Sequence, residues 1–564
     1  MSASTADQRP EGRSGRSRNR LRGPLISLGV LVALLVLGEG AVRLGGWAGA
    51  PLDVLRLAGL PNRGEPATLW DRDLLYRLRP DTLMFNAYRI NRLGYRGPDV
   101  DAIKPPDTLR IVCTGDSSTF GMGVADDETW PARLADMLEV LLEGARHVEV
   151  INAAVPGYST EQNRRQVERD LLALQPDVLI VCPTAQNDLR WQVNAGDAAA
   201  LDGNTHWRRL LDQSHLLRLV RGGGLRDAFH VSGRRDPDTP GARPRVTPAE
   251  FEANLQRMSE AALEHNVLPV LLVTEHSEWR ESIDPAIDAS EDTVVRIADE
   301  SGALAADARE AFAGYAPYPM FSDGIHFTEL GQQLVANAAL RALLQQPELL
   351  ASGGRVGALA DWSAGLDNPA SGDPGRAAGP EGIPRLRELF ERDGPGALAA
   401  FNREIGMTTR PVDPRLAAAI DGSRRGEYLD MLPLFEAALA DAPADVEALF
   451  EYGMALRRAG RRDEGTEMFR RGAQADPEGA IGRFLAGLLA FEAGDMATAE
   501  PALRDAIALR STLGLARFTL GRLLLQRGEL DEAEKQLRMS ILMRTESDAA
   551  AALLLEIEAR RADG

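Results

Sequence analysis

Five short apolar runs between residues 109 and 346 alternate with longer amphipathic segments. Each run is bounded by turn-forming residues, as expected for buried strands of a parallel sheet. The runs lie at 109–114, 148–151, 178–182, 267–274 and 303–307. The amphipathic segments predict helices at 129–142, 160–174, 248–265, 290–301 and 328–344. This alternation predicts an α/β domain over 109–346 with a doubly wound parallel sheet of the flavodoxin-like kind.

The alternation stops at Leu189 and resumes at Thr247, where a Thr-Pro-Ala-Glu sequence begins the next predicted helix. The intervening segment follows the strand at 178–182, and loops at the carboxyl ends of strands shape substrate pockets. We therefore expect residues 189–246 to form an insertion at the mouth of any site.

The last third of the chain has a period of 34 residues. Gly453, Gly487 and Gly521 share this spacing, and Phe435, Phe469, Leu503 and Leu537 do too. Residues 412–564 resemble tetratricopeptide repeats, which implies an all-α solenoid of helix pairs. Such arrays present a concave surface to a protein partner; a rigid spacer or a dimer contact is the alternative. A Gly/Ala/Pro-rich linker, 351–382, precedes the array.

A serine follows the first apolar run, at a turn that begins with glycine. The sequence at 115–121 is Gly-Asp-Ser-Ser-Thr-Phe-Gly. A serine at such a turn has its hydroxyl at the carboxyl end of the sheet, where α/β folds bind their ligands. Gly-Asp-Ser also suits an ordinary turn, so a nucleophile and a structural turn are both open on this motif alone.

Two later segments favour a nucleophile at Ser117. Asp323 and His326 share the loop before the last predicted helix, and such a pair can orient an imidazole and let it take a serine proton. Asn187 follows the run at 178–182, where its amide can donate to a developing oxyanion. Gly157 follows the run at 148–151 and would let a backbone N–H approach a substrate closely.

Serine, glycine, asparagine and histidine in this order, each at a strand end, resemble the SGNH (GDSL-type) hydrolase family over residues 110–344. Gly115-Asp116-Ser117 matches the first block and Gly157 the second. Asn187-Asp188 matches the third block and Asp323-x-x-His326 the last. The third block usually reads Gly-x-Asn-Asp, and Ala185 stands here in the position of the glycine.

The resemblance implies a serine esterase that needs no metal and no cofactor. Ser117 would attack an ester carbonyl, His326 would act as general base, and Asp323 would orient it. The backbone N–H groups of Ser117 and Gly157 and the amide of Asn187 would form the oxyanion hole. Envelope members of the family point to O-acyl, often O-acetyl, esters of cell-envelope or exported carbohydrate. An O-acyltransferase and a catalytically silent glycan-binding scaffold that works through its repeats are the alternatives.

The N-terminal residues predict a membrane anchor. A segment with six arginines, 1–23, precedes an apolar run at 24–44 that Glu39 interrupts. The arginines favour a cytoplasmic tail, so we expect a single-pass protein of a bacterial inner membrane with its other domains in the periplasm. A signal peptide cleaved near 48–50 is the alternative and also places the rest of the chain outside the cytoplasm. Residues 46–108 would be a juxtamembrane segment with no part in catalysis.

Composition narrows the range of partners. A chain of 564 residues exceeds one core, so two or three domains are expected. The formal charge of -19 argues against a nucleic-acid partner. Cys113 and Cys182 each lie just before a strand-end motif. They are either small buried hydrophobes or, if their strands are neighbours, a disulfide in an oxidising compartment.

Overall fold

The computed structural model describes residues 67–202, 242–350 and 413–563, apart from short gaps, and three residues near position 36. Several sequence predictions lie outside the described residues: most of the run at 24–44, most of the insertion, the linker at 351–382, and Asp323. Among the residues that are described, no helix combines the length and the apolar character needed to cross a bilayer.

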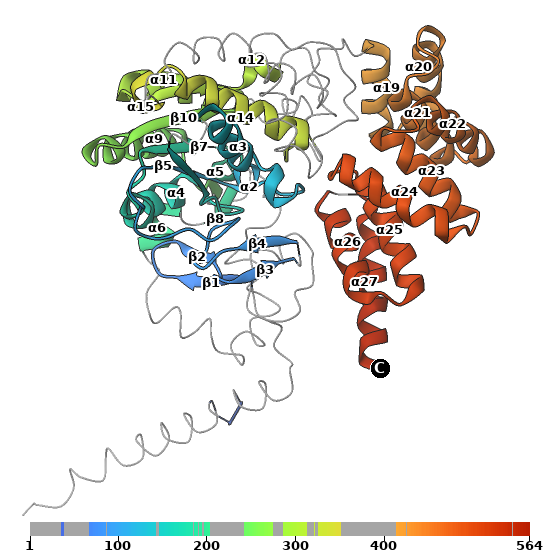
Figure 1. Ribbon diagram of the computed structural model, residues 1–564, viewed down its shortest axis with the longest axis horizontal. Coiled ribbons are helices and arrows are strands. Elements are labelled where there is room, and N and C mark those ends of the chain that lie inside the picture. The colour runs from blue at the N-terminus through green and yellow to red at the C-terminus, as the bar shows by residue number, and fades with distance from the viewer. Residues whose placement is uncertain are drawn as a thin grey trace, which may run out of the picture. The chain divides into compact units, whose positions relative to one another are not determined.

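Five parallel strands form the central sheet in the order β11-β10-β7-β5-β6 (Figure 1). They are β5 (Thr108–Gly115), β6 (His147–Asn152), β7 (Val178–Cys182), β10 (Leu268–Val273) and β11 (Leu304–Asp307). These bounds lie within one residue of the sequence prediction, and the parallel α/β fold is confirmed. The strand order reverses at β5, which has β6 on one side and β7 on the other. Parallel sheets bind ligands beyond the carboxyl ends of their strands at such a point.

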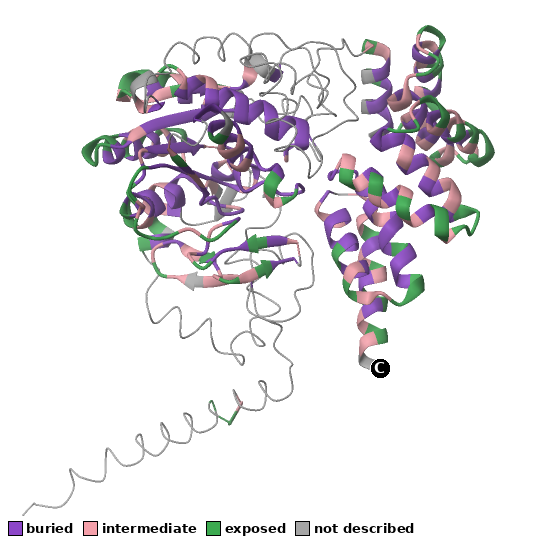
Figure 2. Ribbon diagram, in the orientation of Figure 1, coloured by how far each residue is buried: buried purple, intermediate pink, exposed green. Residues whose placement is uncertain are grey.

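Alternate residues of β5 face opposite helical layers, as the pleat of a strand requires. Ile111 and Cys113 pack against α3 (Trp130–Leu142) and α14 (Glu329–Leu343). Val112 packs on the other face with α9 (Pro248–Glu264) and α11 (Ala286–Ser301). The central strands β5 and β7 are therefore buried along their whole length, and the sheet is mostly purple in Figure 2.

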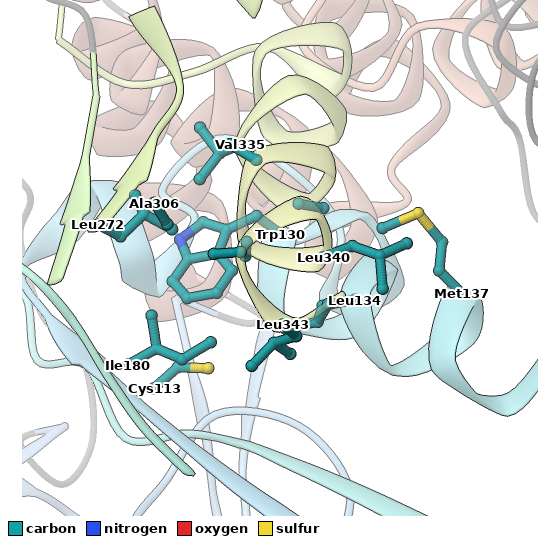
Figure 3. Close-up of a cluster of buried hydrophobic side chains, with 14 of the residues drawn as sticks. Cys113, Trp130, Leu134, Met137, Ile180, Leu272, Ala306, Val335, Leu340 and Leu343 are labelled. Atoms are coloured by element: carbon teal, nitrogen blue, oxygen red, sulfur yellow. The ribbon is translucent and has the colours of Figure 1, made fainter. Parts of the chain in front are cut away.

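Trp130 is the largest fully buried side chain of the α3 and α14 layer. Figure 3 shows its indole among Cys113 and Ile180 of the sheet and Val335 of α14. Burial of such an aromatic contributes about 2–3 kcal/mol, so Trp130 anchors α3 just after the turn that carries Ser117.

The predicted helix at 160–174 has three parts. An α-helix, α4 (Thr160–Gln166), runs into a π-helical turn at Val167–Leu171 and ends in a 3-10 turn at Leu172–Leu174. Ser159 caps α4 by accepting from the backbone N–H of Gln162. Capping of this kind fixes where the helix begins, directly after the loop that contains Gly157.

The described part of the predicted juxtamembrane segment consists of two hairpins. In the first, β1 (Thr68–Asp71) pairs with β2 (Leu75–Leu78), and in the second, β3 (Thr82–Met84) pairs with β4 (Tyr88–Ile90). Both contribute to a buried cluster that also contains Phe120 and Tyr158 of the α/β domain. The segment is thus packed on the two loops that carry Ser117 and Gly157.

The two ends of the insertion meet in a short antiparallel ribbon. Strand β8 (Trp191–Val193) pairs with β9 (Ala242–Pro244), and α6 (Asp197–Asp202) follows β8. The ribbon returns the chain to the start of α9 beside the end of β7.

The repeat region is helical throughout its described residues, as predicted. Its helices are α19 (Pro414–Arg424), α20 (Tyr428–Asp441), α21 (Val446–Arg458), α22 (Arg462–Ala475), α23 (Ala480–Glu492), α24 (Met496–Leu509), α25 (Gly514–Arg527), α26 (Leu530–Leu542) and α27 (Ser547–Asp563). A Cβ on Gly453 would lie 2.5 Å from the Phe469 ring, and one on Gly521 would lie 2.8 Å from Leu537. The periodic glycines therefore permit the close crossing of each helix pair.

Candidate active site

The turn after β5 presents Ser117 at the carboxyl end of the sheet. Ser117 begins a one-turn helix, α2 (Ser117–Phe120), which Asp116 caps by accepting from Ser118 N at 2.9 Å. Gly115 lies so close to β7 that a Cβ there would be 2.8 Å from the Cys182 carbonyl oxygen. Ser117 is partly exposed, whereas the residues on either side of it are buried. The fold therefore leaves one hydroxyl accessible at this turn.

His326 faces this hydroxyl. Its Nε2 lies 2.9 Å from Ser117 Oγ, which is hydrogen-bond distance. The histidine precedes α14, whose N-cap is Thr328. Gln332 of α14 is fully buried and accepts from the backbone N–H of Trp130 at 2.8 Å, so it ties α14 to α3. The serine and the histidine that the sequence predicted are thus brought together across 209 residues.

Asn187 lies in a buried helical turn, α5 (Ala185–Asp188), after β7. Its Nδ2 donates to Asp116 Oδ2 at 2.7 Å and to the Tyr158 carbonyl at 3.0 Å. A side-chain amide has two N–H donors, and both are used here. Ala185 packs in the apolar layer beneath this turn and has a negative φ, so the position does not require glycine.

Gly157 lies in the loop between β6 and α4 with φ of +84°. A residue with a side chain rarely adopts this conformation, so the loop depends on glycine. Gly157 is partly exposed between buried neighbours. Within the described residues, no group accepts from the backbone N–H of Gly157 or from that of Ser117. Both donors belong to partly exposed residues at the carboxyl end of the sheet.

Arg96 is a residue of this site that sequence reasoning did not select. Its buried guanidinium donates to the carbonyls of Phe120 at 2.5 Å, Gly121 at 2.6 Å and Val124 at 2.8 Å. These are carbonyls at and beyond the C-terminal end of α2, where a cation is favourable. Its Nε donates to Asp126 at 2.8 Å. The sequence carries no local signal for this role, because the partners of Arg96 are backbone carbonyls. Arg96 lies in the segment 46–108, for which the sequence predicts no part in catalysis.

Asp188 stabilises the neighbouring loop rather than facing the serine. Its carboxylate accepts from the backbone N–H of Thr160 at 2.9 Å and from the Thr160 hydroxyl. Burial raises the pKa of Asp188 from 3.8 to about 7, although the bonds from Thr160 and the charge of Arg245 oppose this. Asp188 therefore joins the end of β7 to the start of α4.

The first turn of α14, three residues after His326, also contacts the repeat region. Glu329 accepts from the Thr512 backbone N–H at 2.5 Å and from its hydroxyl at 2.6 Å. Ser511 donates to Glu128 at 2.5 Å, and burial together with the charge of Glu329 raises the pKa of Glu128 to about 7. Two buried carboxylates of the α/β domain thus have partners from the loop between α24 and α25.

Cys113 and Cys182 lie on neighbouring strands as free, buried thiols. Burial raises the pKa of Cys113 well above its usual range and that of Cys182 to about 12, so neither is a thiolate. In the part of the chain that the structure describes, no group of three or more His, Cys, Asp or Glu side chains is placed to hold a metal ion.

Solved structures resemble about two fifths of the chain at low sequence identity. LAE5, an α/β hydrolase enzyme from the metagenome of Lake Arreo, Spain, is 21% identical over 43% of this chain and 97% of its own, with a TM-score of 0.29. The acetylxylan esterase Axe2 from Geobacillus stearothermophilus is 19% identical over 42% of this chain and 94% of its own, with a TM-score of 0.30. TesA is 15% identical over 42% and 97%, with a TM-score of 0.28.

Family models match both regions of the chain. Residues 113–334 match the GDSL-like lipase/acylhydrolase family. Tetratricopeptide-repeat models match residues 416–480, 455–514 and 490–557. No curated protein matches the chain. The protein is therefore an ester-hydrolysing enzyme that contains a GDSL/SGNH hydrolase domain, and tetratricopeptide repeats follow this domain.

Proposed function

We propose that Ser117 and His326 carry out the hydrolysis of O-acyl esters through an acyl-enzyme. The observation that carries this proposal is the distance of 2.9 Å between Ser117 Oγ and His326 Nε2 at the strand-order reversal of the sheet. The imidazole takes the hydroxyl proton as the oxygen attacks the ester carbonyl, and it then protonates the leaving alcohol. Water releases the acyl group in a second round of the same steps. We assign the orientation of His326 to Asp323.

The backbone N–H groups of Ser117 and Gly157 are the proposed donors to the oxyanion. Both lie at the same edge of the sheet, and no described group accepts from either. Asn187 is the third proposed donor. Because its two N–H groups are already used by Asp116 and Tyr158, donation to an oxyanion requires it to release one of them. In the free enzyme, its role is to hold Asp116 and the Tyr158 carbonyl in place.

The proposed substrate is an O-acyl, most simply O-acetyl, ester of cell-envelope or exported carbohydrate. The resemblance of the four sequence blocks to envelope SGNH proteins supports this choice. The same acyl-enzyme would serve an O-acyltransferase if a sugar hydroxyl reached it before water.

The proposed location is outside the cytoplasm, on a single anchor at 24–44. The arginine-rich segment at 1–23 before the apolar run supports this topology. Fusions of two reporters after Gly382 test it, one active only in the cytoplasm and one only outside it. Activity of the cytoplasmic reporter would overturn the topology.

We further propose that the repeats bind a protein partner.

Labelling of the purified protein by a fluorophosphonate probe tests the nucleophile. Wild-type protein is expected to be labelled at Ser117, and Ser117→Ala is expected to lose label and about three decades or more of turnover of a small acetyl ester. Ser118→Ala is the matched control, because the adjacent hydroxyl is buried and points toward the Ile325 carbonyl. Turnover by Ser117→Ala near the wild-type level would remove Ser117 from this role.

Product analysis separates hydrolysis from transfer. The protein is incubated with an acetyl donor and an oligosaccharide acceptor together. Free acetate without acylated oligosaccharide supports the esterase. Acylated oligosaccharide that forms faster than acetate would replace hydrolysis by transfer while leaving Ser117 as the nucleophile.

A further inference from the structure

The peptide bond between Pro156 and Gly157 is held by a residue outside the predicted hydrolase domain. The Tyr76 hydroxyl donates to the Pro156 carbonyl oxygen at 2.9 Å. No cis peptide occurs in the described chain. In a planar trans peptide, the carbonyl and the N–H point in opposite directions. A bond to the Pro156 carbonyl therefore fixes the direction in which the Gly157 N–H points.

The following peptide is held from a different side. Arg245, at the end of the insertion, donates from Nη1 to the Gly157 carbonyl at 2.9 Å. Arg245 forms an ion pair with Asp197 at 2.8 Å, and both side chains are almost completely buried. Asp197 in turn accepts from the Ser159 hydroxyl at 2.6 Å. Since Gly157 has no side chain to pack, these bonds on either side of it set its conformation.

Tyr76 is itself held firmly. The Tyr158 hydroxyl donates to the Tyr76 carbonyl at 2.6 Å, and the two rings pack edge to face at 5.2 Å between centroids. Buried Gln162 of α4 donates to the Leu74 carbonyl at 2.7 Å, just before Tyr76. Strand β2, which carries Tyr76, pairs with β1, and Asp71 of β1 forms an ion pair with Arg169 at 2.7 Å. The backbone of β2 around Tyr76 is therefore held in place, and so is the Tyr76 hydroxyl that donates to the Pro156 carbonyl.

We propose that Tyr76 is a positioning residue for catalysis, because its hydroxyl aims the Gly157 N–H at the oxyanion. The inference rests on the proposed ester hydrolysis at Ser117. It assigns to the segment before the hydrolase domain a part in the reaction, through a hydrogen bond to the backbone of the Gly157 loop. Donors that are oriented before the reaction stabilise developing charge without reorganisation, so the benefit appears in the transition state.

Tyr76→Phe in the full chain tests this proposal, because it removes only the hydroxyl and keeps the packed ring. We expect kcat for a small acetyl ester to fall about tenfold or more with KM within about twofold, since the lost orientation matters in the transition state and not in ground-state binding. The affinity for a boronic acid, which places an oxygen in the oxyanion position, should fall by a similar factor. The pH profile should not shift, because His326 is untouched.

Tyr158→Phe is the matched control. It removes the other hydroxyl of the same ring pair and leaves the bond to the Pro156 carbonyl intact. We expect its kcat to fall clearly less than that of Tyr76→Phe, because β2 keeps its pairing with β1 and the bond from Gln162 to Leu74. Both variants are assayed well below their melting temperatures, which are measured first, so that partial unfolding does not contribute.

The outcomes separate the inference from the function on which it rests. A wild-type chain that neither hydrolyses the ester nor reacts with a fluorophosphonate probe would overturn the proposed function. An active wild type with unchanged kcat and boronic-acid affinity in Tyr76→Phe would overturn the inference alone. Equal losses in Tyr76→Phe and Tyr158→Phe would also overturn it, because they would reflect loosening of the ring pair.

Discussion

The Nδ2 of Asn187 lies 2.7 Å from Oδ2 of Asp116, so a side-chain amide joins the end of β7 to the turn that carries Ser117. Both residues are almost completely buried. A buried carboxylate needs such donors. A buried neutral polar group without a partner costs about 1–3 kcal/mol in the free energy of folding, and a buried charge without a partner costs more. The contact is therefore a condition for the geometry of the nucleophile turn.

Asn187→Asp should destabilise the protein more than Asn187→Ala at pH 8. The substitution places a second carboxylate against Asp116, and two such groups resist ionising together, which raises the pKa of one of them. The stability of Asn187→Asp should therefore fall as the pH rises from 5 to 8, more steeply than that of Asn187→Ala. Urea denaturation at both pH values measures this difference. Parallel pH dependence in the two variants would contradict the prediction.

Asp188→Asn should make the stability of the protein less dependent on pH, whereas Asn187→Asp should make it more dependent on pH. Burial raises the pKa of Asp188 from 3.8 to about 7 in the folded protein, whereas the unfolded chain has an ordinary value of about 3.9. The folded state thus keeps a proton that the unfolded state loses, so this group's contribution to stability is full below about pH 4 and falls as the pH rises to about 7. The asparagine variant should lack this decline.

Melting temperatures of wild type and Asp188→Asn between pH 4 and 8 test this expectation. Asp202→Asn is the control, because Asp202 is an exposed carboxylate that pairs with Arg165 at 2.7 Å. If the difference between wild type and Asp188→Asn stayed constant over this pH range, Asp188 would not retain its proton in the folded state.

Arg96→Lys should reduce both stability and turnover. The guanidinium donates to three carbonyls and to Asp126 at once, and a lysine ammonium cannot reproduce this planar set of donors. We expect a loss of about 1–3 kcal/mol in the free energy of unfolding and a lower kcat, because α2 carries Ser117. Chemical denaturation and steady-state kinetics measure the two effects.

Arg92→Lys provides the comparison for Arg96→Lys within the same segment. Arg92 forms an ion pair with Asp101 at 2.5 Å in which both side chains are more than half exposed. Exposed pairs contribute about 0–1 kcal/mol, so this variant should resemble wild type. Similar losses of stability and kcat in the two variants would mean that the hydrogen bonds of Arg96 to the end of α2 contribute no more than an exposed ion pair does.

Replacing the two donors of the repeat loop, Ser511→Ala with Thr512→Val, should lower the melting temperature at pH 8. Glu128 and Glu329 would lose hydroxyl donors while remaining buried, and hydrogen bonds to charged groups contribute about 1.5–3 kcal/mol each. Thr466→Val is the comparison within the repeats. It removes a half-buried hydroxyl that donates to the Arg462 carbonyl and accepts from Arg457 at 3.3 Å, and it should have a smaller effect because no buried carboxylate loses a donor. An unchanged melting temperature in the double variant would show that this contact adds no stability.

Local pattern was sufficient for the five strands of the central sheet, for the helical repeats and for the order of the chemical blocks, but not for the hairpins before the sheet or for the ribbon at the ends of the insertion. The strands at 109–114 and 178–182 are continuous apolar runs, because both faces of a parallel sheet are covered by helices. The repeats were recognisable because the close crossing of each helix pair requires small residues such as Gly453 at a fixed period. Ser117 and His326 could be paired from the sequence because Ser117 follows a predicted strand and His326 precedes the last predicted helix of the same α/β domain.

What only the tertiary structure decided are the contacts between segments far apart in the chain. The bond from Tyr76 to Pro156 spans 80 residues, and that from Arg245 to Gly157 spans 88. Arg96 was invisible as a site residue because its partners are backbone carbonyls, which have no signature in the sequence. Hydrophobic period and turn chemistry act over a few residues and determine the elements. The orientation of the Gly157 peptide depends instead on hydrogen bonds that exist only after the sheet, the hairpins and the insertion have packed together.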